Sequence, residues 1–123
     1  MSNAANLFPR HLESVGIQSG TNYVIGSAMD RDRCPDFHNL WNHEVRPNPP
    51  QANFDQSQTD FVAACVEFFQ AHPKMGAMVL ECTGMQPFAR ALQREIFIPI
   101  FSWGTLLDYA YSIAVHRDYY GHV

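Results

Sequence analysis

The side chain with the clearest chemical potential in this sequence is Cys82, which follows a short apolar run at residues 77–80. Such a run is typical of a buried parallel strand. Thr83 and Gly84 come next as a small-residue turn, and Pro87 is suited to the first turn of a helix. A cysteine at the carboxyl end of a parallel strand, facing a helix N-terminus, is where an α/β fold would place a reactive thiolate.

Two interpretations of Cys82 stay open at this point. In the functional one, the following helix lowers the thiol pKa, and Thr83 and Gly84 supply a hydroxyl and backbone N–H groups that hold a substrate carboxylate. In the other, Cys82 is a packed thiol that ends an apolar strand, which is a common arrangement. Spacing alone favours the packed thiol, and Glu81 is more often a surface residue than a general base.

The other candidate residues point away from catalysis and metal binding. Cys65 lies on the apolar face of a predicted helix, which indicates core packing, and Cys34 precedes Pro35 in a polar loop, where we expect a neutral role. His38 and His43 are five residues apart, so the two imidazoles do not share one helix face. We therefore expect no metal site, and there is no glycine-rich phosphate-binding motif.

Length and composition restrict the class of protein. With 123 residues, of which 46% are hydrophobic, the chain is predicted to be a single globular domain, residues 1–123. Only 16% of residues are charged and the net charge is −4, which argues against nucleic-acid and membrane partners. Without a signal-peptide pattern or a disulfide framework for its three cysteines, we expect a cytoplasmic location. Residues 1–4 could derive from an expression tag.

The pattern of apolar residues predicts an alternating order of helices and strands. Helices are expected at 6–15, 56–72, 87–95 and from 105 onward, and strands at 21–29, 77–82 and 96–101. The polar segment 30–53 is expected to be an ordered loop with a helical turn or two at 35–43, which lines a pocket or covers a neighbouring subunit. This order predicts a three-layer α/β fold with a small, mostly parallel sheet flanked by helices.

Three local features are also predicted. Thr59 is expected to cap the long helix, and Thr105 with Asp108 resembles a capping box. In the last helix, apolar residues recur with a spacing of three and four, which predicts a buried face. That face consists of Leu106, Leu107, Ala110, Ile113 and Ala114.

Three segments carry a resemblance to a known family. Residues 77–85 read AMVLECTGM, residues 87–93 read PFARALQ, and residues 98–101 read IPIF. Together they resemble the C-terminal half of the aspartate/glutamate racemase superfamily, which includes hydantoin racemases. The resemblance extends over most of this chain but over only about half of a typical member.

The resemblance implies a fold, a reaction and site residues. Members consist of two similar α/β domains with a cleft between them, and each domain supplies one catalytic cysteine. One cysteine removes the α-proton as a thiolate and the other delivers a proton to the opposite face, without metal or cofactor. Cys82 matches the cysteine of the second half, and Thr83 matches a residue that helps to hold the substrate carboxylate. Gly84 belongs to the same segment, although many relatives have Asn there.

The sequence departs from this pattern because the first half and its cysteine have no counterpart in it. We therefore expect a half-protein, inactive or weak alone as a racemase of a small amino acid or hydantoin-like substrate. A homo-oligomer or a separate N-terminal half would have to complete the site. The alternative is a non-catalytic binding or oligomerisation module derived from the same fold. In that case we expect a buried Cys82 and a large apolar surface around residues 30–54.

Overall fold

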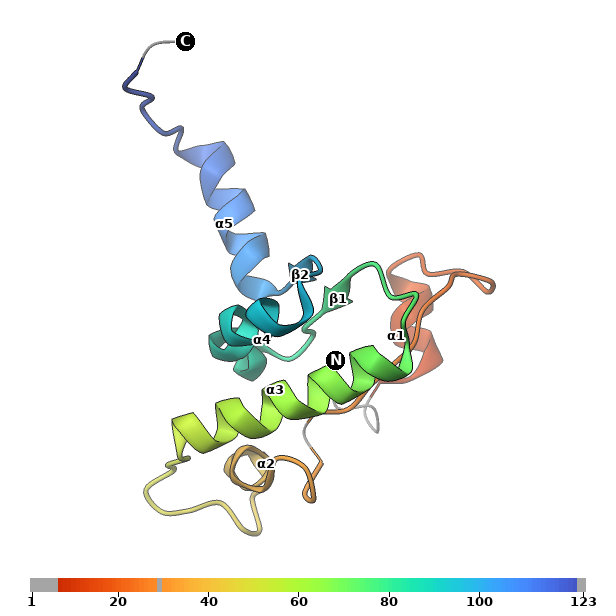
Figure 1. Ribbon diagram of the computed structural model, residues 1–123, viewed down its shortest axis with the longest axis vertical. Coiled ribbons are helices and arrows are strands. Elements are labelled where there is room, and N and C mark those ends of the chain that lie inside the picture. Colours follow the sequence, from red (N-terminus) through yellow and green to blue (C-terminus); the bar gives the residue numbers. More distant parts are fainter. Residues whose placement is uncertain (1–6, 29, 122–123) are drawn as a thin grey trace.

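The computed structural model describes residues 7–28 and 30–121 (Figure 1). The predictions for residues 1–4, for residue 6 as the start of the first helix and for residue 29 as the end of the first strand lie outside the described residues. The elements in chain order are α1 (Pro9–Ser14), α2 (Pro35–Trp41), α3 (Phe54–Ala71), β1 (Met78–Val79), the 3₁₀-helix η2 (Thr83–Phe88), α4 (Ala89–Ile96), β2 (Ile100–Phe101) and α5 (Trp103–Ala114). The described part of the chain is a mixture of helices with a small parallel sheet, which confirms an α/β fold in this coarse sense.

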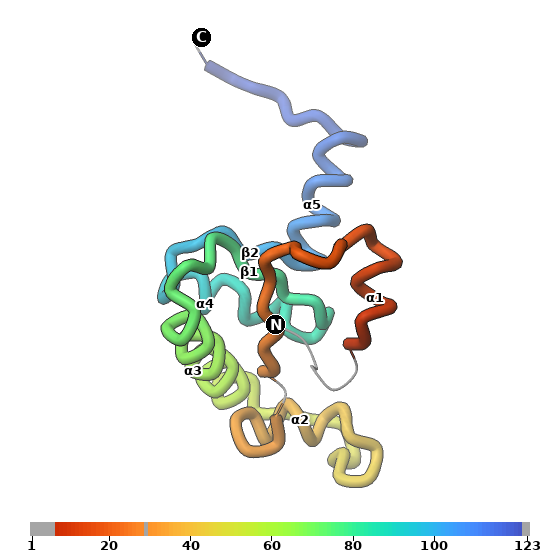
Figure 2. The backbone as a smooth tube through the Cα atoms, turned by 90° about the vertical axis from the view of Figure 1, so that its right-hand side faces the viewer, coloured from red at the N-terminus to blue at the C-terminus, as the bar shows by residue number. Residues whose placement is uncertain are grey.

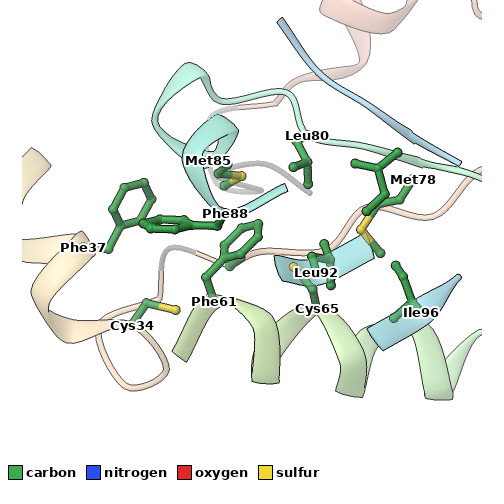
Figure 3. Packing of buried hydrophobic residues seen from close by; sticks show 12 residues of the cluster. Cys34, Phe37, Phe61, Cys65, Met78, Leu80, Met85, Phe88, Leu92 and Ile96 are labelled. Atoms are coloured by element: carbon green, nitrogen blue, oxygen red, sulfur yellow. The ribbon is translucent and has the colours of Figure 1, made fainter. Parts of the chain in front are cut away.

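The core lies between α3, α4 and one face of the sheet. The apolar stripe of α3 buries Phe61 and Cys65 against Leu92 and Ile96 of α4, as Figure 3 shows. Phe88 joins this core to α2, because its ring lies 5.7 Å from Phe37 and 5.4 Å from Phe61 between ring centroids. Burial of these large apolar side chains is the main source of stability for a chain of this size.

The sheet consists of β1 and β2, which pair in parallel with Met78 opposite Ile100 and Val79 opposite Phe101. The helix α4 connects them, as expected for a parallel crossover. Met78 and Ile100 point into the core, whereas Val79 and Phe101 on the other face are 58% and 54% exposed. Helices of the described chain therefore bury one face of the sheet and leave the other accessible to solvent.

The predicted first strand, residues 21–29, is wrong for the described residues. Tyr23, Val24 and Ile25 are extended and largely exposed, and only Ser27 forms an isolated bridge. β-Branched and aromatic residues suit a pleated, half-buried surface, but a strand needs a partner strand. The described sheet therefore has two strands where three were expected, and each is shorter than the predicted segments 77–82 and 96–101.

Two predicted caps are also wrong. The N-cap of α3 is Asn53, whose side chain accepts a hydrogen bond from the backbone N–H of Gln56 at 3.1 Å, while the Thr59 hydroxyl donates to Asp55 within the helix. The capping box of α5 consists of Ser102 and Thr105, and Asp108 takes no part in it.

The predicted buried face of the last helix is exposed. Every residue of α5 except Gly104 and every residue that follows it to position 121 is exposed, and α5 projects away from the rest of the chain in Figures 1 and 2. The apolar spacing correctly predicted a helix with an apolar side, but nothing in the described chain covers that side. No helix among the described residues combines the length and the hydropathy needed to cross a membrane.

Candidate functional site

The turn from Glu81 to Gln86 places Cys82 at the carboxyl end of β1. Leu80 donates a backbone hydrogen bond to Phe101 at 2.8 Å and ends the sheet pairing. Cys82 then has an extended backbone, and its carbonyl accepts from the N–H of Met85 at 3.1 Å, which starts η2. Leu80 and Met85 are buried on either side of the turn, so the core fixes its position (Figure 3). The strand-to-turn position predicted for Cys82 is therefore present, with a 3₁₀-helix in place of the expected helix start.

Gly84 lies directly beneath two aromatic rings of α2. A Cβ atom at this position would lie 3.0 Å from both Phe37 and Trp41, so the close packing of α2 on the turn favours glycine. The polar segment that contains α2 thus covers the turn that follows Cys82. The helical spacing of Phe37 and Trp41 indicated a helix in this segment, but no sequence pattern indicated that the helix would contact Gly84.

The three cysteines differ sharply in accessibility. Cys34 and Cys65 are fully buried, whereas Cys82 is partly accessible, and all three thiols are free. Burial raises the pKa of Cys34 to about 11, with the nearby charges of Asp60 and Asp30 adding to the effect. Burial likewise raises the pKa of Cys65 to about 12. Both buried thiols are therefore held in the neutral form near pH 7, which agrees with the core role predicted for Cys65.

The far side of the turn is tied to the start of α5. The indole N–H of Trp103 donates to the backbone carbonyl of Glu81 at 3.1 Å, and the N–H of Gly104 donates to the Gln86 side chain at 3.2 Å. An open hollow of about 260 Å³ lies on this side, lined mainly by apolar side chains of β1, β2 and α5. Glu81 borders this hollow, and Cys82 does not.

Thr83, the next residue along the chain, is exposed. Within the described part of the chain, no three or more His, Cys, Asp or Glu side chains are grouped so that they could hold a metal ion. Cys82 is partly buried and packs against the core, and the turn that follows it lies next to the ring of Trp41, which is about half exposed.

Comparisons with known proteins give limited information. No family model matches the chain, and no solved structure matches it. A segment of 49 residues is 37% identical to dimethylsulfoniopropionate lyase 5 of Emiliania huxleyi (strain CCMP1516). That segment is 40% of this chain, and it spans about one tenth of the length of the curated relative that it matches.

Proposed function

We propose that this chain is one half of a cofactor-independent enzyme of the aspartate/glutamate racemase superfamily, which transfers the α-proton of a small amino acid or hydantoin-like substrate. The observation that carries the proposal is the contrast between the cysteines: Cys82 alone of the three keeps some accessible surface, and it follows a parallel strand. The three free thiols favour a reducing, cytoplasmic setting for this activity.

The chemistry assigned to Cys82 is proton transfer at carbon. As a thiolate, its sulfur takes the α-proton and leaves a carbanion that the adjacent carboxylate or imide carbonyl stabilises. A second acid on the opposite face then delivers a proton to the same carbon, which inverts its configuration. Thr83 donates a hydrogen bond to the substrate carboxylate, and Gly84 allows α2 to pack closely so that Trp41 borders the substrate.

The second acid has to come from another chain or from a separate N-terminal half, since Cys34 and Cys65 are buried and protonated. The complete enzyme would also have the three-layer architecture expected from the family. In that arrangement, protein covers the face of the sheet that carries Val79 and Phe101.

The partial similarity to a dimethylsulfoniopropionate lyase adds one substrate to the test. The name of that protein describes a lyase acting on a small carboxylate. Elimination of a sulfonium group from a propionate also requires a base that removes a proton from carbon. The role proposed for the Cys82 thiolate would serve that reaction as well, so a lyase substrate belongs in the test.

Proton exchange in heavy water tests this proposal. The exchange of the α-proton is followed by NMR for aspartate, glutamate, a 5-substituted hydantoin and dimethylsulfoniopropionate. We expect slow exchange with at least one of them and at least a tenfold loss in Cys82→Ala, because the base is removed. The matched control, Cys34→Ala, removes a buried thiol and should keep the wild-type rate. Equal rates for wild type and Cys82→Ala with every substrate would rule out the catalytic role.

A non-catalytic binding or oligomerisation module is the second candidate, because α5 presents its apolar residues to solvent. This surface lies on α5 and the adjoining sheet face, and the segment 30–54, where apolar surface was expected, also exposes Trp41, Val45 and Phe54. For such a module, Cys82→Ala changes no exchange rate, whereas substitutions on α5 change association.

A further inference from the structure

The largest feature that the proposed chemistry does not use is the apolar side of α5. Its apolar residues recur with spacings of three and four along the helix, which places them on one side. They are Trp103, Leu106, Leu107, Ala110, Ile113 and Ala114, and we call this set the α5 stripe. The larger members, including Leu107 at 65% and Ile113 at 59%, are exposed. Only the first turn of α5 is anchored, through Trp103 and Gly104.

The α5 stripe is continuous with the uncovered face of the sheet. Val79 and Phe101 of that face line the open hollow together with Trp103 and Leu106 from the start of the stripe. A parallel sheet is almost always covered on both faces, and an amphipathic helix buries its apolar side against another element. One occupant lying along α5 and over this hollow would satisfy both requirements.

The chain exposes more surface than a compact monomer of its mass, as expected if an apolar surface is covered in an assembly. The chain exposes 9257 Å². A compact monomer of 14.0 kDa is expected to expose about 6,700 Å². This excess of about 2,500 Å² is spread over the whole chain, including the residues after α5, and the roughly 800 Å² that each partner buries in a stable interface of standard size is a minor part of it.

We propose that the occupant is a second copy of this chain, whose α5 packs antiparallel to the first around a two-fold axis near Ala110. Around this axis Leu107 of each copy lies level with Ile113 of the other, and Leu106 lies level with Ala114. The same patch serves on both copies, as the symmetry of a closed dimer requires. Ala110 at the centre is small enough for the two helices to approach closely.

The remaining residues of α5 fit this pairing. The α5 stripe contains no charged residue, so the pairing buries no ion and sets no like charges against each other. Thr105, Asp108 and Ser112 lie on the opposite side of the helix, where they remain in water. The C-terminal end of the second α5, with Ile113 and Ala114, lies over the hollow beside Val79 and Phe101 of the first copy.

Light scattering coupled to size-exclusion chromatography, run over a range of protein concentrations, tests the dimer. We expect the wild type to run at twice the mass of one chain. Leu107→Glu places a charge in the pairing and should weaken association by about 100-fold. Ser112→Glu adds the same charge on the opposite side of α5 and should remain dimeric. Because α5 is exposed in a single chain, neither variant removes a core contact, and circular dichroism should be unchanged.

Cross-linking provides a second readout that also tests the position of the axis. In a Cys82→Ser background, Ala110→Cys should give a disulfide-linked dimer under mild oxidation, because the two copies of residue 110 face each other. Ser112→Cys in the same background should give none. A monomeric wild type at 100 µM, or equal cross-linking at both positions, would overturn the proposal and leave the α5 stripe to a different protein. These outcomes do not depend on proton exchange at Cys82, so the dimer and the proposed reaction succeed or fail separately.

Discussion

At the scale of single residues, burial assigns different roles to the three cysteines. Cys34 and Cys65 have no exposed surface, and burial holds their pKa values well above the usual range. Cys82 is accessible on a turn that Leu80 and Met85 hold from the core side. Sequence spacing favoured a packed thiol at position 82, and Cys82 does pack partly against the core, but spacing could not show that it keeps accessible surface while Cys34 and Cys65 do not.

Thiol labelling measures this difference directly. In the native protein, we expect one thiol per chain to react rapidly with Ellman's reagent, and three after unfolding in urea. Cys82→Ser should abolish the rapid phase, because the reagent reaches neither remaining thiol in the folded chain. Cys34→Ala is the matched control and should retain it. A rapid phase that persists in Cys82→Ser would show that a supposedly buried cysteine is reactive.

At the scale of elements, the end of α4 is the most informative position. Phe97 follows the last residue of α4 with a left-handed backbone (φ 51°), and its side chain is 85% exposed. A left-handed backbone costs an L-residue about 1–2 kcal/mol, and glycine is the usual residue at such a helix end. The backbone conformation of Phe97 therefore lowers the free energy of unfolding, and the few contacts of its exposed side chain compensate for little of this loss.

Replacement of Phe97 by glycine is expected to increase the stability of the folded chain. Phe97→Gly should raise the free energy of unfolding by about 0.5–1 kcal/mol, because the relief of strain exceeds the added entropy of the unfolded chain. Phe97→Ala keeps the Cβ atom and should lie within about 0.5 kcal/mol of wild type. Urea unfolding measures both. A Phe97→Gly variant less stable than Phe97→Ala would show that the phenylalanine backbone is not strained.

Elements with a strong local pattern were predictable, and those that depend on a distant partner were not. The helices predicted at 6–15 and 56–72 correspond to α1 and α3, and Gly16 and Pro73 come shortly after their ends. Residues 23–25 have the composition of a strand but no strand beside them. The candidate site shows the same contrast. The turn at Cys82 was predictable from its own residues. The packing of α2 on Gly84 was not, because it joins segments 43 residues apart in the sequence.

At the scale of the whole molecule, the core is concentrated on one side of a small sheet. Phe61, Phe88 and Leu92 gather α3, η2 and α4 around it, while α5 lies outside. The two buried thiols belong to this core, so their ionisation is linked to global unfolding.

Stability should therefore fall at alkaline pH. The pKa values of Cys34 and Cys65 are raised on folding from 9.0 to about 11 and about 12, so the folded state binds more protons than the unfolded state between these limits. The stabilisation is fully present below pH 9 and is lost as the pH rises toward the folded values. Urea unfolding at pH 8.0 and pH 10.5 should show this decrease. A Cys34→Ala/Cys65→Ala double variant should show a smaller one, and an identical decrease would assign it to other groups.

The hydrogen bonds that anchor the first turn of α5 also determine where its far end lies. Trp103 bonds to Glu81 and Gly104 bonds to Gln86, so the helix takes its direction from residues on both sides of Cys82. With 12 residues, α5 is about 18 Å long, and a rotation of about 10° about its first turn moves its last residue by about 3 Å. A small rearrangement of the Cys82 turn is therefore enlarged along the helix, and a partner that fixes the orientation of α5 restricts the conformations open to that turn.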